Sequence, residues 1–300
     1  MIPKKILVIY YSQTGQLGEI INTFIEPLIA TGMLVEKVSI KPVNDYPFPW
    51  TGENFYEVMP DCVLGVPVKL APFVLKETGY DLIILGYQAW FLSPSIPANS
   101  LLQDSSFKSV LKDTPVITIT GARNMWLNAF IGIKKLLRES GADHVGNIAL
   151  VDRHWNPVSY FTIFHWMLGG RKTKLLGLFP LPGVAEADIR HTKVFGETVM
   201  PHLTSGKWNG LQDSLVEQKA VAYNYSLMVL EAKAGPQYVA WANWVNKSKN
   251  PKTVLQVFKY YLHVALFMGA PVLLLLDALC IKPFSAKRIE MKKKYYLSLN

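Results

Sequence analysis

Hydroxyl and amide side chains gather in one turn near the start of the chain. The turn lies between an apolar strand pattern and an amphipathic helical pattern, and it consists of Ser12, Gln13, Thr14, Gly15 and Gln16. Backbone N–H groups, hydroxyls and the positive end of a helix converge in such a turn, which suits a phosphate. No glycine-rich dinucleotide pattern and no P-loop lysine is present, so those two kinds of phosphate site fit poorly. The alternative is an ordinary strand-to-helix turn capped by Thr14.

Two later loops also follow strand patterns and could contact a ligand held by that turn. The first is aromatic and consists of Tyr87, Gln88, Ala89, Trp90 and Phe91. Its rings could form a flat apolar wall, or they could pack beneath the proline-rich segment that follows. The second loop consists of Gly121, Ala122, Arg123 and Asn124.

Arg123 and Asn124 are the polar side chains of the second loop. A guanidinium pairs bidentately with carboxylates, so Arg123 could clamp a substrate or face an anionic edge of a bound ring. Asn124 offers both a donor and an acceptor. The alternative is a solvated arginine at a helix start, which the positive end of the helix disfavours. We therefore expect both residues to take part in the chemistry.

His154 follows the last strand pattern and is the candidate general base, because imidazole titrates near neutral pH. A structural role is the alternative, as it is for His165, which stands among aromatic residues. No histidine shows metal-ligand spacing, so no metal site is expected. A hydrolase would lack its nucleophile, since no Gly-x-Ser-x-Gly sequence occurs.

Strand and helix patterns alternate up to about residue 152, which predicts a doubly wound parallel sheet with helices on both faces. The strand patterns lie at 5–10, 34–40, 81–86, 115–120 and 146–151, and the helical patterns lie at 16–31, 66–78, 101–112 and 125–140. In such a sheet, ligands bind at the carboxyl ends of the strands near the point where the strand order reverses. We expect the loops described above to meet there.

The alternation stops after residue 152. Helical patterns follow at about 185–203, 213–233 and 236–247. We therefore expect an α/β domain at 1–152 and a mostly helical extension at 153–300. Within the first part, the aromatic and turn-rich segment 41–60 is either a lid over a ligand or a surface loop held by its aromatic side chains.

The net charge of +9 comes from the end of the chain, because residues 233–300 contain 11 basic and 2 acidic residues. The same segment contains an uncharged apolar run, 264–276, which is shorter than the roughly 20 residues that span a bilayer. Pro271 interrupts the run, and basic residues flank it on both sides. We expect 252–300 to lie on, or re-enter, an anionic membrane surface and not to bind nucleic acid. A buried helix with a solvated basic tail is the alternative.

The two cysteines, Cys62 and Cys280, exclude a disulfide scaffold, and no signal-peptide pattern opens the chain. We therefore expect a cytoplasmic protein, held peripherally at the inner face of the cell membrane by its basic tail.

Residues 4–152, with their phosphate-type turn, resemble the flavodoxin-like FMN proteins. The resemblance implies that residues 12–16 hold the phosphate of FMN and that 87–91 and 121–123 contact its ring. Arg123 would place positive charge near the N1–O2 edge of that ring. The sequence departs from the family pattern at Leu17, where a hydroxyl usually stands.

The loops at 86–94 and 122–126, with the hydrophobic tail, are similar to a narrower family. Its members are the aromatase partners of a ketosynthase in dialkylresorcinol and flexirubin-type biosynthesis, some of them called "dialkylresorcinol condensing enzyme". The resemblance implies an FMN-dependent oxidoreductase that aromatises a dialkyl cyclohexane-1,3-dione, with or without a carboxylate. Deprotonation and hydride transfer to flavin N5 would give the resorcinol. It also implies a lipophilic substrate, a ketosynthase partner and a homodimer.

Two other functions fit the same fold. An NAD(P)H-dependent quinone or enone reductase would consume a nicotinamide, for which the sequence offers no clear site. A non-catalytic scaffold that recruits the ketosynthase to the membrane would bind no flavin, and Leu17 favours it. The basic tail disfavours an electron-carrying flavodoxin, because such carriers are usually acidic.

Overall fold

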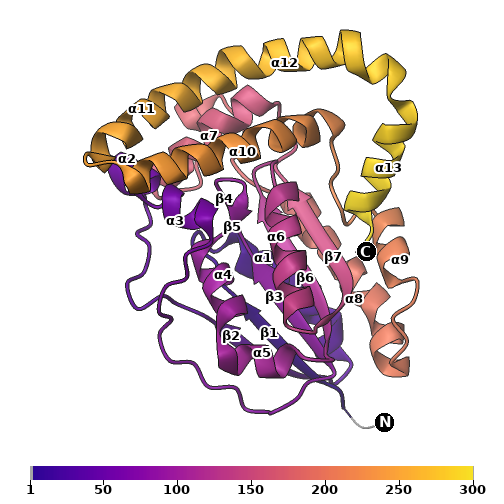
Figure 1. Ribbon diagram of the computed structural model, residues 1–300. Coiled ribbons are helices and arrows are strands. Elements are labelled where there is room, and N and C mark those ends of the chain that lie inside the picture. Colours follow the sequence, from indigo (N-terminus) through magenta and orange to yellow (C-terminus); the bar gives the residue numbers. More distant parts are fainter. Residues whose placement is uncertain (1–2, 300) are drawn as a thin grey trace.

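A five-stranded parallel sheet forms the centre of the computed structural model, which describes residues 3–299. The strand order is β2-β1-β3-β6-β7, with bounds Leu34–Ser39, Lys5–Tyr10, Leu82–Tyr87, Pro115–Ala122 and Asp143–Val151. All neighbouring pairs are parallel, and the order reverses between β1 and β3 (Figure 1). The predicted doubly wound sheet is confirmed. Residues 1, 2 and 300 of the two predicted parts lie outside the described residues.

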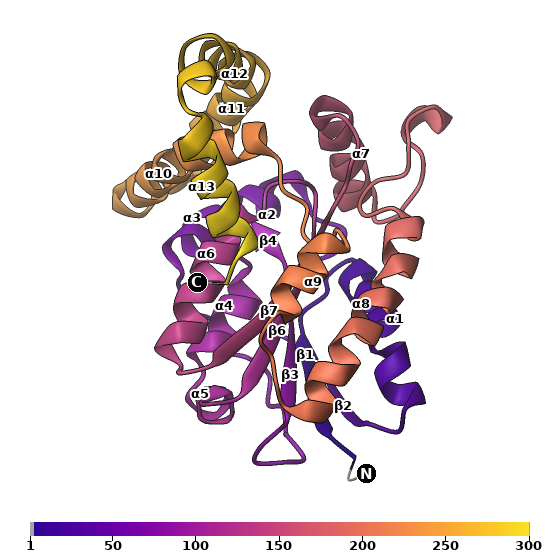
Figure 2. The same cartoon turned by 90° about the vertical axis from the view of Figure 1, so that its right-hand side faces the viewer.

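Helices cover both faces of the sheet because its strands are apolar on both sides. Ile6 and Val8 of β1 face one cluster, and the alternating residues Leu7 and Ile9 face the other. The first cluster is covered by α1, α8 and α9, whose bounds are Gln16–Ala30, Glu186–Ser205 and Leu211–Glu217. The second is covered by α4, α5 and α6, whose bounds are Ile96–Gln103, Ser105–Leu111 and Leu127–Glu139. The two groups lie on opposite sides of the sheet in Figure 2.

The helical extension packs directly on the α/β part. Helices α1 and α8 lie so close that a Cβ atom at Gly196 would meet the carbonyl oxygen of Phe24 at 2.0 Å. At the outer edge of β7, the Ala149 N–H donates to Ala220 at 2.8 Å and Ala149 accepts from Ala222 at 3.0 Å. The extension therefore covers one face and one edge of the sheet.

The predicted helix at 66–78 is wrong. The chain is irregular there, because Pro67 and Pro72 lack an N–H and restrict the residues before them. Two short helices form earlier instead: α2 at Gly52–Glu57, inside the segment 41–60 that was predicted as a loop, and α3 at Met59–Leu64, which begins at the end of that segment.

Other helix boundaries also differ from the predictions. The pattern at 101–112 is divided at Asp104, whose carboxylate caps α5 by accepting the N–H groups of Ser106 and Phe107, both at 3.0 Å. The patterns at 213–233 and 236–247 correspond to α9 and to one helix, α10 (Tyr225–Lys247), which continues through Pro236. Between α7 (Asn156–Gly169) and α8 lies a short 3₁₀ turn, η1 (Leu175–Gly177).

One helix of 34 residues, Pro251–Phe284, is long and apolar enough to cross a membrane by length and composition. Its successive parts are α11 (Pro251–Val264), η2 (Ala265–Gly269), α12 (Ala270–Leu276), η3 (Asp277–Ile281) and η4 (Lys282–Phe284). Pro271 does not interrupt it, contrary to expectation. A π-helical turn, η2, lies just before the proline, and such a turn accommodates the missing N–H.

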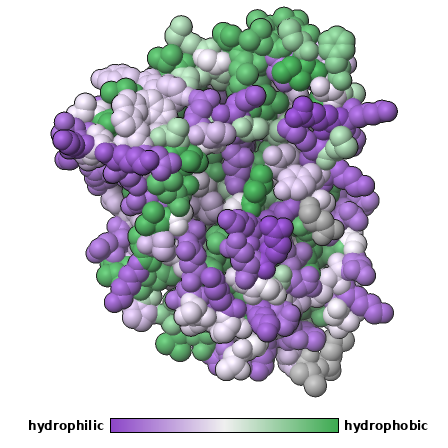
Figure 3. All heavy atoms as spheres, viewed as in Figure 1, coloured by the Kyte–Doolittle hydropathy of each residue, from purple (hydrophilic) through white to green (hydrophobic). Residues whose placement is uncertain are grey.

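Both ends of this helix are attached to the same body. Near its start, Phe258 is buried in a cluster with Tyr56 of α2. After its end, α13 (Ala286–Leu297) returns to the sheet edge, where Gln212 donates to the carbonyl of Leu297 at 2.8 Å. The helix therefore lies along the molecule, and apolar residues gather on the surface where α12 runs (Figure 3).

Candidate functional site

A cavity of about 210 Å³ lies at the carboxyl ends of the strands. Each predicted loop contributes to its wall; the contributing residues are Gln13, Thr14, Gln16, Gln88, Ala89, Trp90, Phe91, Gly121, Ala122 and Arg123. Helix α7 (Asn156–Gly169) and the backbone at Gly183 supply another side. The other predicted site residues, Ser12, Gly15, Tyr87, Asn124 and His154, are not in this wall.

The turn before α1 keeps free backbone donors. Gly15 has a left-handed backbone with φ of 87°, which brings the chain into the helix. The Ser12 hydroxyl accepts the Gly18 N–H at 3.3 Å, so it braces the turn. Among residues 3–299, the N–H groups of Gln13, Thr14 and Gly15 donate to no protein acceptor. These donors and the positive end of α1 can hold a phosphate.

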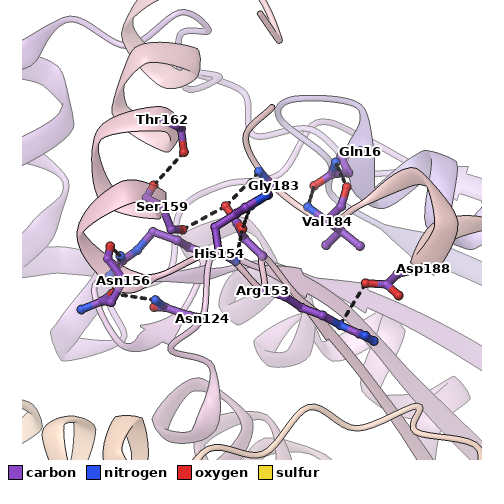
Figure 4. Close-up of polar contacts among 12 residues, drawn as sticks. Gln16, Asn124, Arg153, His154, Asn156, Ser159, Thr162, Gly183, Val184 and Asp188 are labelled. Carbon is purple, nitrogen blue, oxygen red and sulfur yellow. Dashed lines mark hydrogen bonds and ion pairs between the residues drawn. The ribbon is translucent and has the colours of Figure 1, made fainter. Parts of the chain in front are cut away.

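The side chains of Gln16 and Leu17 do not serve as phosphate ligands. The Gln16 side chain accepts the Val184 N–H at 3.0 Å and donates to the Val184 carbonyl at 3.2 Å (Figure 4). It therefore fixes the extension against the turn. Leu17, in the first turn of α1, is almost fully buried and lines the cavity with an apolar side chain that has no hydroxyl to offer a phosphate.

Trp90 lies in an aromatic cluster beside the turn. Its ring meets those of Tyr11, Tyr46 and Trp50 edge-on, at centroid distances of 5.9, 5.1 and 5.6 Å. Trp50 also donates from Nε1 to Oε1 of Gln13 at 2.9 Å. This bond ties the segment 41–60 to the turn, and Trp50 itself lines the cavity.

Phe91 and Leu92 form the tip of a small hairpin. Its strands are β4 (Ala89–Trp90) and β5 (Ser93–Pro94), and both tip residues have positive φ, 46° and 62°. Two-residue hairpin tips with positive φ at both positions usually carry Asn-Gly, because larger side chains are strained there. The hairpin therefore holds the Phe91 ring in the cavity wall at a conformational cost.

Arg123 presents a positive charge at the cavity without an acidic partner. Its Nη1 donates to Oδ1 of Asn156 at 2.8 Å, and its guanidinium lies 6.0 Å from the centre of the Tyr160 ring. Within the described residues, no carboxylate lies at ion-pair distance from it. Burial lowers the pKa of Arg123, but arginine stays charged in proteins. An anionic ligand group would compensate this charge.

Two buried side-chain oxygens in the predicted loops also lack partners among the described residues. Asn124 donates from Nδ2 to Oδ1 of Asn156 at 2.7 Å, but its own Oδ1 accepts no hydrogen bond from the described residues. Gln88 Oε1, in the cavity wall, is likewise without a donor. Buried acceptors are normally satisfied, so a ligand N–H group beside Gln88 fits this wall. FMN combines a ring that carries an N–H group and an anionic edge with a phosphate, and the residues that line the cavity fit these groups.

His154 lies outside the cavity wall. Its Nδ1 donates to Oδ1 of Asp152 at 2.6 Å, and its side chain is 39% exposed. The other carboxylate oxygen of Asp152 accepts from Ser159 at 2.9 Å and from the Gly183 N–H at 3.3 Å. Asp152 thus joins the end of β7 to α7 and to the loop at Gly183. The role of His154 as a base stays a prediction.

The extension supplies cavity residues that the sequence analysis did not name as site residues. They are Ile163, Phe164, Trp166, Met167 and Gly183. The aromatic composition of 155–183 was a signal, but it does not reveal which residues approach a loop some 150 positions earlier in the chain.

Comparisons with protein-family models and with curated proteins give no match. Among solved structures, a flavoprotein from Lactobacillus acidophilus in complex with FMN is similar, with 17% identity, a TM-score of 0.40, and coverage of 49% of this chain and 93% of its own. A flavoprotein from Bacteroides eggerthii has 18% identity, a TM-score of 0.39 and coverage of 50% and 90%. A flavone reductase has 8% identity, a TM-score of 0.37 and coverage of 68% and 64%.

The strand order decides the fold, since 2-1-3-4-5 in chain order, with a cavity at the reversal, is the arrangement of flavodoxin. The fold is flavodoxin-like. The helical extension is added to that flavodoxin-like core and contributes to its ligand cavity.

Proposed function

We propose that this flavodoxin-like protein is an FMN-dependent oxidoreductase that aromatises a dialkyl cyclohexane-1,3-dione. One observation carries the proposal: an unpaired guanidinium and a turn with free N–H donors line the same aromatic cavity. The cavity can therefore hold a phosphate at the turn and an anionic oxygen at Arg123. An apolar surface on the extension supports a lipophilic substrate.

The residues of the turn would hold the FMN phosphate through the N–H groups of Gln13, Thr14 and Gly15. Trp90 and Phe91 would pack against the flavin ring and exclude water from it. When bound, FMN supplies a hydride acceptor at N5. The resorcinol differs from the dione by two hydrogens, which leave as one proton and one hydride. Molecular oxygen or a quinone would then take up the two electrons.

Arg123 would act on the substrate by binding its enolate oxygen. A 1,3-dione is acidic for a carbon acid, and a fixed cation stabilises the enolate further. Asn156 and the Tyr160 ring hold the guanidinium in place. His154 and bulk water are the candidates to accept the proton. Among the described residues that line the cavity, only Arg123 is titratable, and it stays protonated.

The apolar helix supports a location at a membrane surface, where an alkylated dione would concentrate. Val272, Leu275 and Leu279 are exposed by 57, 60 and 64%. Lysines flank the helix, and both of its ends are attached to the α/β part, which favours a helix that lies on the bilayer over one that crosses it. A ketosynthase that releases the dione at this surface, and a second copy of the chain, remain proposed partners.

The test is to purify the full chain, measure its visible spectrum and identify any released cofactor. We expect bound FMN, or uptake of added FMN. The loaded protein should convert 2,5-dialkylcyclohexane-1,3-diones to resorcinols under air without NAD(P)H. A strict need for NAD(P)H would replace the aromatase by a reductase, and a chain that takes up no FMN would support the scaffold function.

A further inference from the structure

A second cavity, about 430 Å³ in volume, lies between α10 and the apolar helix. Most of its wall is apolar, with Leu230, Leu266 and Leu273 among the larger side chains. Among residues 3–299, Lys233 is its one charged wall residue, and no carboxylate lines it. We call this cavity the helix groove. Its wall offers dispersion contacts and few polar partners, so it suits a hydrocarbon.

The helix groove and the candidate active site share a boundary. At the hairpin tip, Phe91 lines the active-site cavity and its neighbour Leu92 lines the groove. Arg123 lines the active-site cavity, and Met125, two residues later, lines the groove. The ring of Tyr238, a groove residue, lies 6.5 Å from that of Phe91. A ligand with its ring in one cavity would have to pass this tip to reach the other.

Small residues keep the groove open. Ala234 lies on the α10 side, and Ala265, Gly269 and Ala270 lie on the side of the apolar helix. A Cβ atom added at Gly269 would meet its nearest heavy atom, the Val264 carbonyl oxygen, only at 4.0 Å. The two helices approach here without side chains that fill the space between them.

An exposed apolar surface adjoins the groove on the side of the apolar helix. Met268 and Val272, which flank Gly269 and Ala270, are exposed by 67 and 57%. Figure 3 shows hydrophobic atoms gathered along this part of the molecule. A chain dissolved in a bilayer against this surface would enter the groove without passing through water.

We propose that the helix groove binds an alkyl chain of the substrate while the ring of that substrate lies beside Arg123. This inference rests on the proposed function for the identity of the ring. The groove itself recognises a long unbranched hydrocarbon chain. Each methylene that it buries strengthens binding about fourfold, until the groove is full.

The test compares 5-alkylresorcinols with methyl, pentyl, heptyl and undecyl chains, bound to the full chain in nanodiscs of phosphatidylcholine and phosphatidylglycerol. Ligand is counted above protein-free nanodiscs, which removes partitioning into lipid. Ala234→Phe and Ala270→Phe fill the groove from opposite sides. Ala240→Phe, an exposed position on α10 outside the groove, is the matched control. Circular dichroism verifies that each variant folds.

We expect the wild type and Ala240→Phe to gain affinity with chain length, and the two groove variants to bind all four ligands alike. A folded groove variant that keeps the full chain-length dependence would overturn the inference. So would a wild type without that dependence, including one whose groove holds a phospholipid chain that the resorcinols do not displace.

The same titrations run on protein with and without added FMN separate the two proposals. A chain-length dependence in a protein that takes up no FMN would uphold the groove and remove the flavin function. FMN uptake without any chain-length dependence would uphold the flavin function and remove the groove as a binding site for the alkyl chain.

Discussion

Arg123 is the residue on which the proposed chemistry most depends, because its guanidinium lines the cavity and forms no ion pair with a carboxylate among residues 3–299. We expect Arg123→Ala to lower kcat/KM for the dione by about 10- to 100-fold, the range for loss of a hydrogen bond to a charged group. FMN content should change little, since the turn before α1 holds the phosphate. Steady-state kinetics on FMN-loaded protein, with absorbance to count the flavin, measures both.

Arg153→Ala is the matched control for this variant. Arg153 stands near the same strand ends, but its Nε pairs with Asp188 at 3.1 Å and it does not line the cavity (Figure 4). Its loss should leave kcat/KM unchanged. Full turnover by flavin-loaded Arg123→Ala would remove Arg123 from the mechanism.

For individual site residues, the sequence predicted a place near the ligand cavity where that place depends on a local strand-loop-helix pattern. The turn at 12–16 and the loops after β3 and β6 are of this kind, and the cavity brings members of each together. The sequence could not predict that Gln16 would bind Val184, because that contact depends on the path of the extension. It also did not show that His154 would face Asp152, two residues earlier, because that contact depends on the local conformation of the loop after β7.

Between elements, Glu231 connects α10 to the α/β part. Its carboxylate, 1% exposed, accepts the N–H groups of Leu127 and Asn128 at the start of α6, at 3.3 and 2.9 Å. Burial raises the pKa of Glu231 from 4.5 to about 7, and this effect outweighs the opposing effect of the helix N–H groups. The contact that attaches α10 therefore responds to pH.

We expect the free energy of unfolding to fall as pH rises from about 4.5 to about 7. In this range the folded protein keeps the Glu231 proton that the unfolded chain releases, so the folded state binds more protons. The slope from this group is at most about 1.4 kcal/mol per pH unit. Urea unfolding at several pH values measures it. Glu231→Gln should flatten the slope, whereas Glu139→Gln, at the exposed other end of α6, should not.

The elements themselves show what a pattern can predict. Strands β1, β3 and β6 are continuous apolar runs that only a sheet covered on both faces can bury, and they were located correctly. The helix expected at 66–78 was predicted from apolar spacing alone, and two prolines prevent a helix from forming there. The helix 251–284 continues because a π-helical turn accommodates Pro271, which apolar spacing does not reveal.

For the molecule as a whole, basic side chains accompany the exposed apolar helix. Lys293 and Lys294, on exposed positions of α13, should each contribute about 1 kcal/mol to binding of an anionic bilayer. Replacing both with glutamine should weaken binding to vesicles containing phosphatidylglycerol about 30-fold at low salt. Sedimentation with such vesicles measures this change.

Lys108 and Lys112, in and after α5, provide the control pair at the opposite end of the molecule (Figure 1). Replacing them with glutamine should leave vesicle binding unchanged. Equal loss in both double variants would mean that net charge alone attracts the protein, and that the apolar helix does not orient it.

The attachment of the helix 251–284 at both ends has a kinetic consequence. A helix fixed in this way cannot orient perpendicular to the bilayer. The protein would therefore lie on one leaflet, with the helix groove open to that leaflet alone. Substrate would then arrive by diffusion in two dimensions, and the rate would follow its mole fraction in the lipid. Adding inert lipid at a constant amount of enzyme and substrate would slow turnover by surface dilution, although every bulk concentration stayed the same.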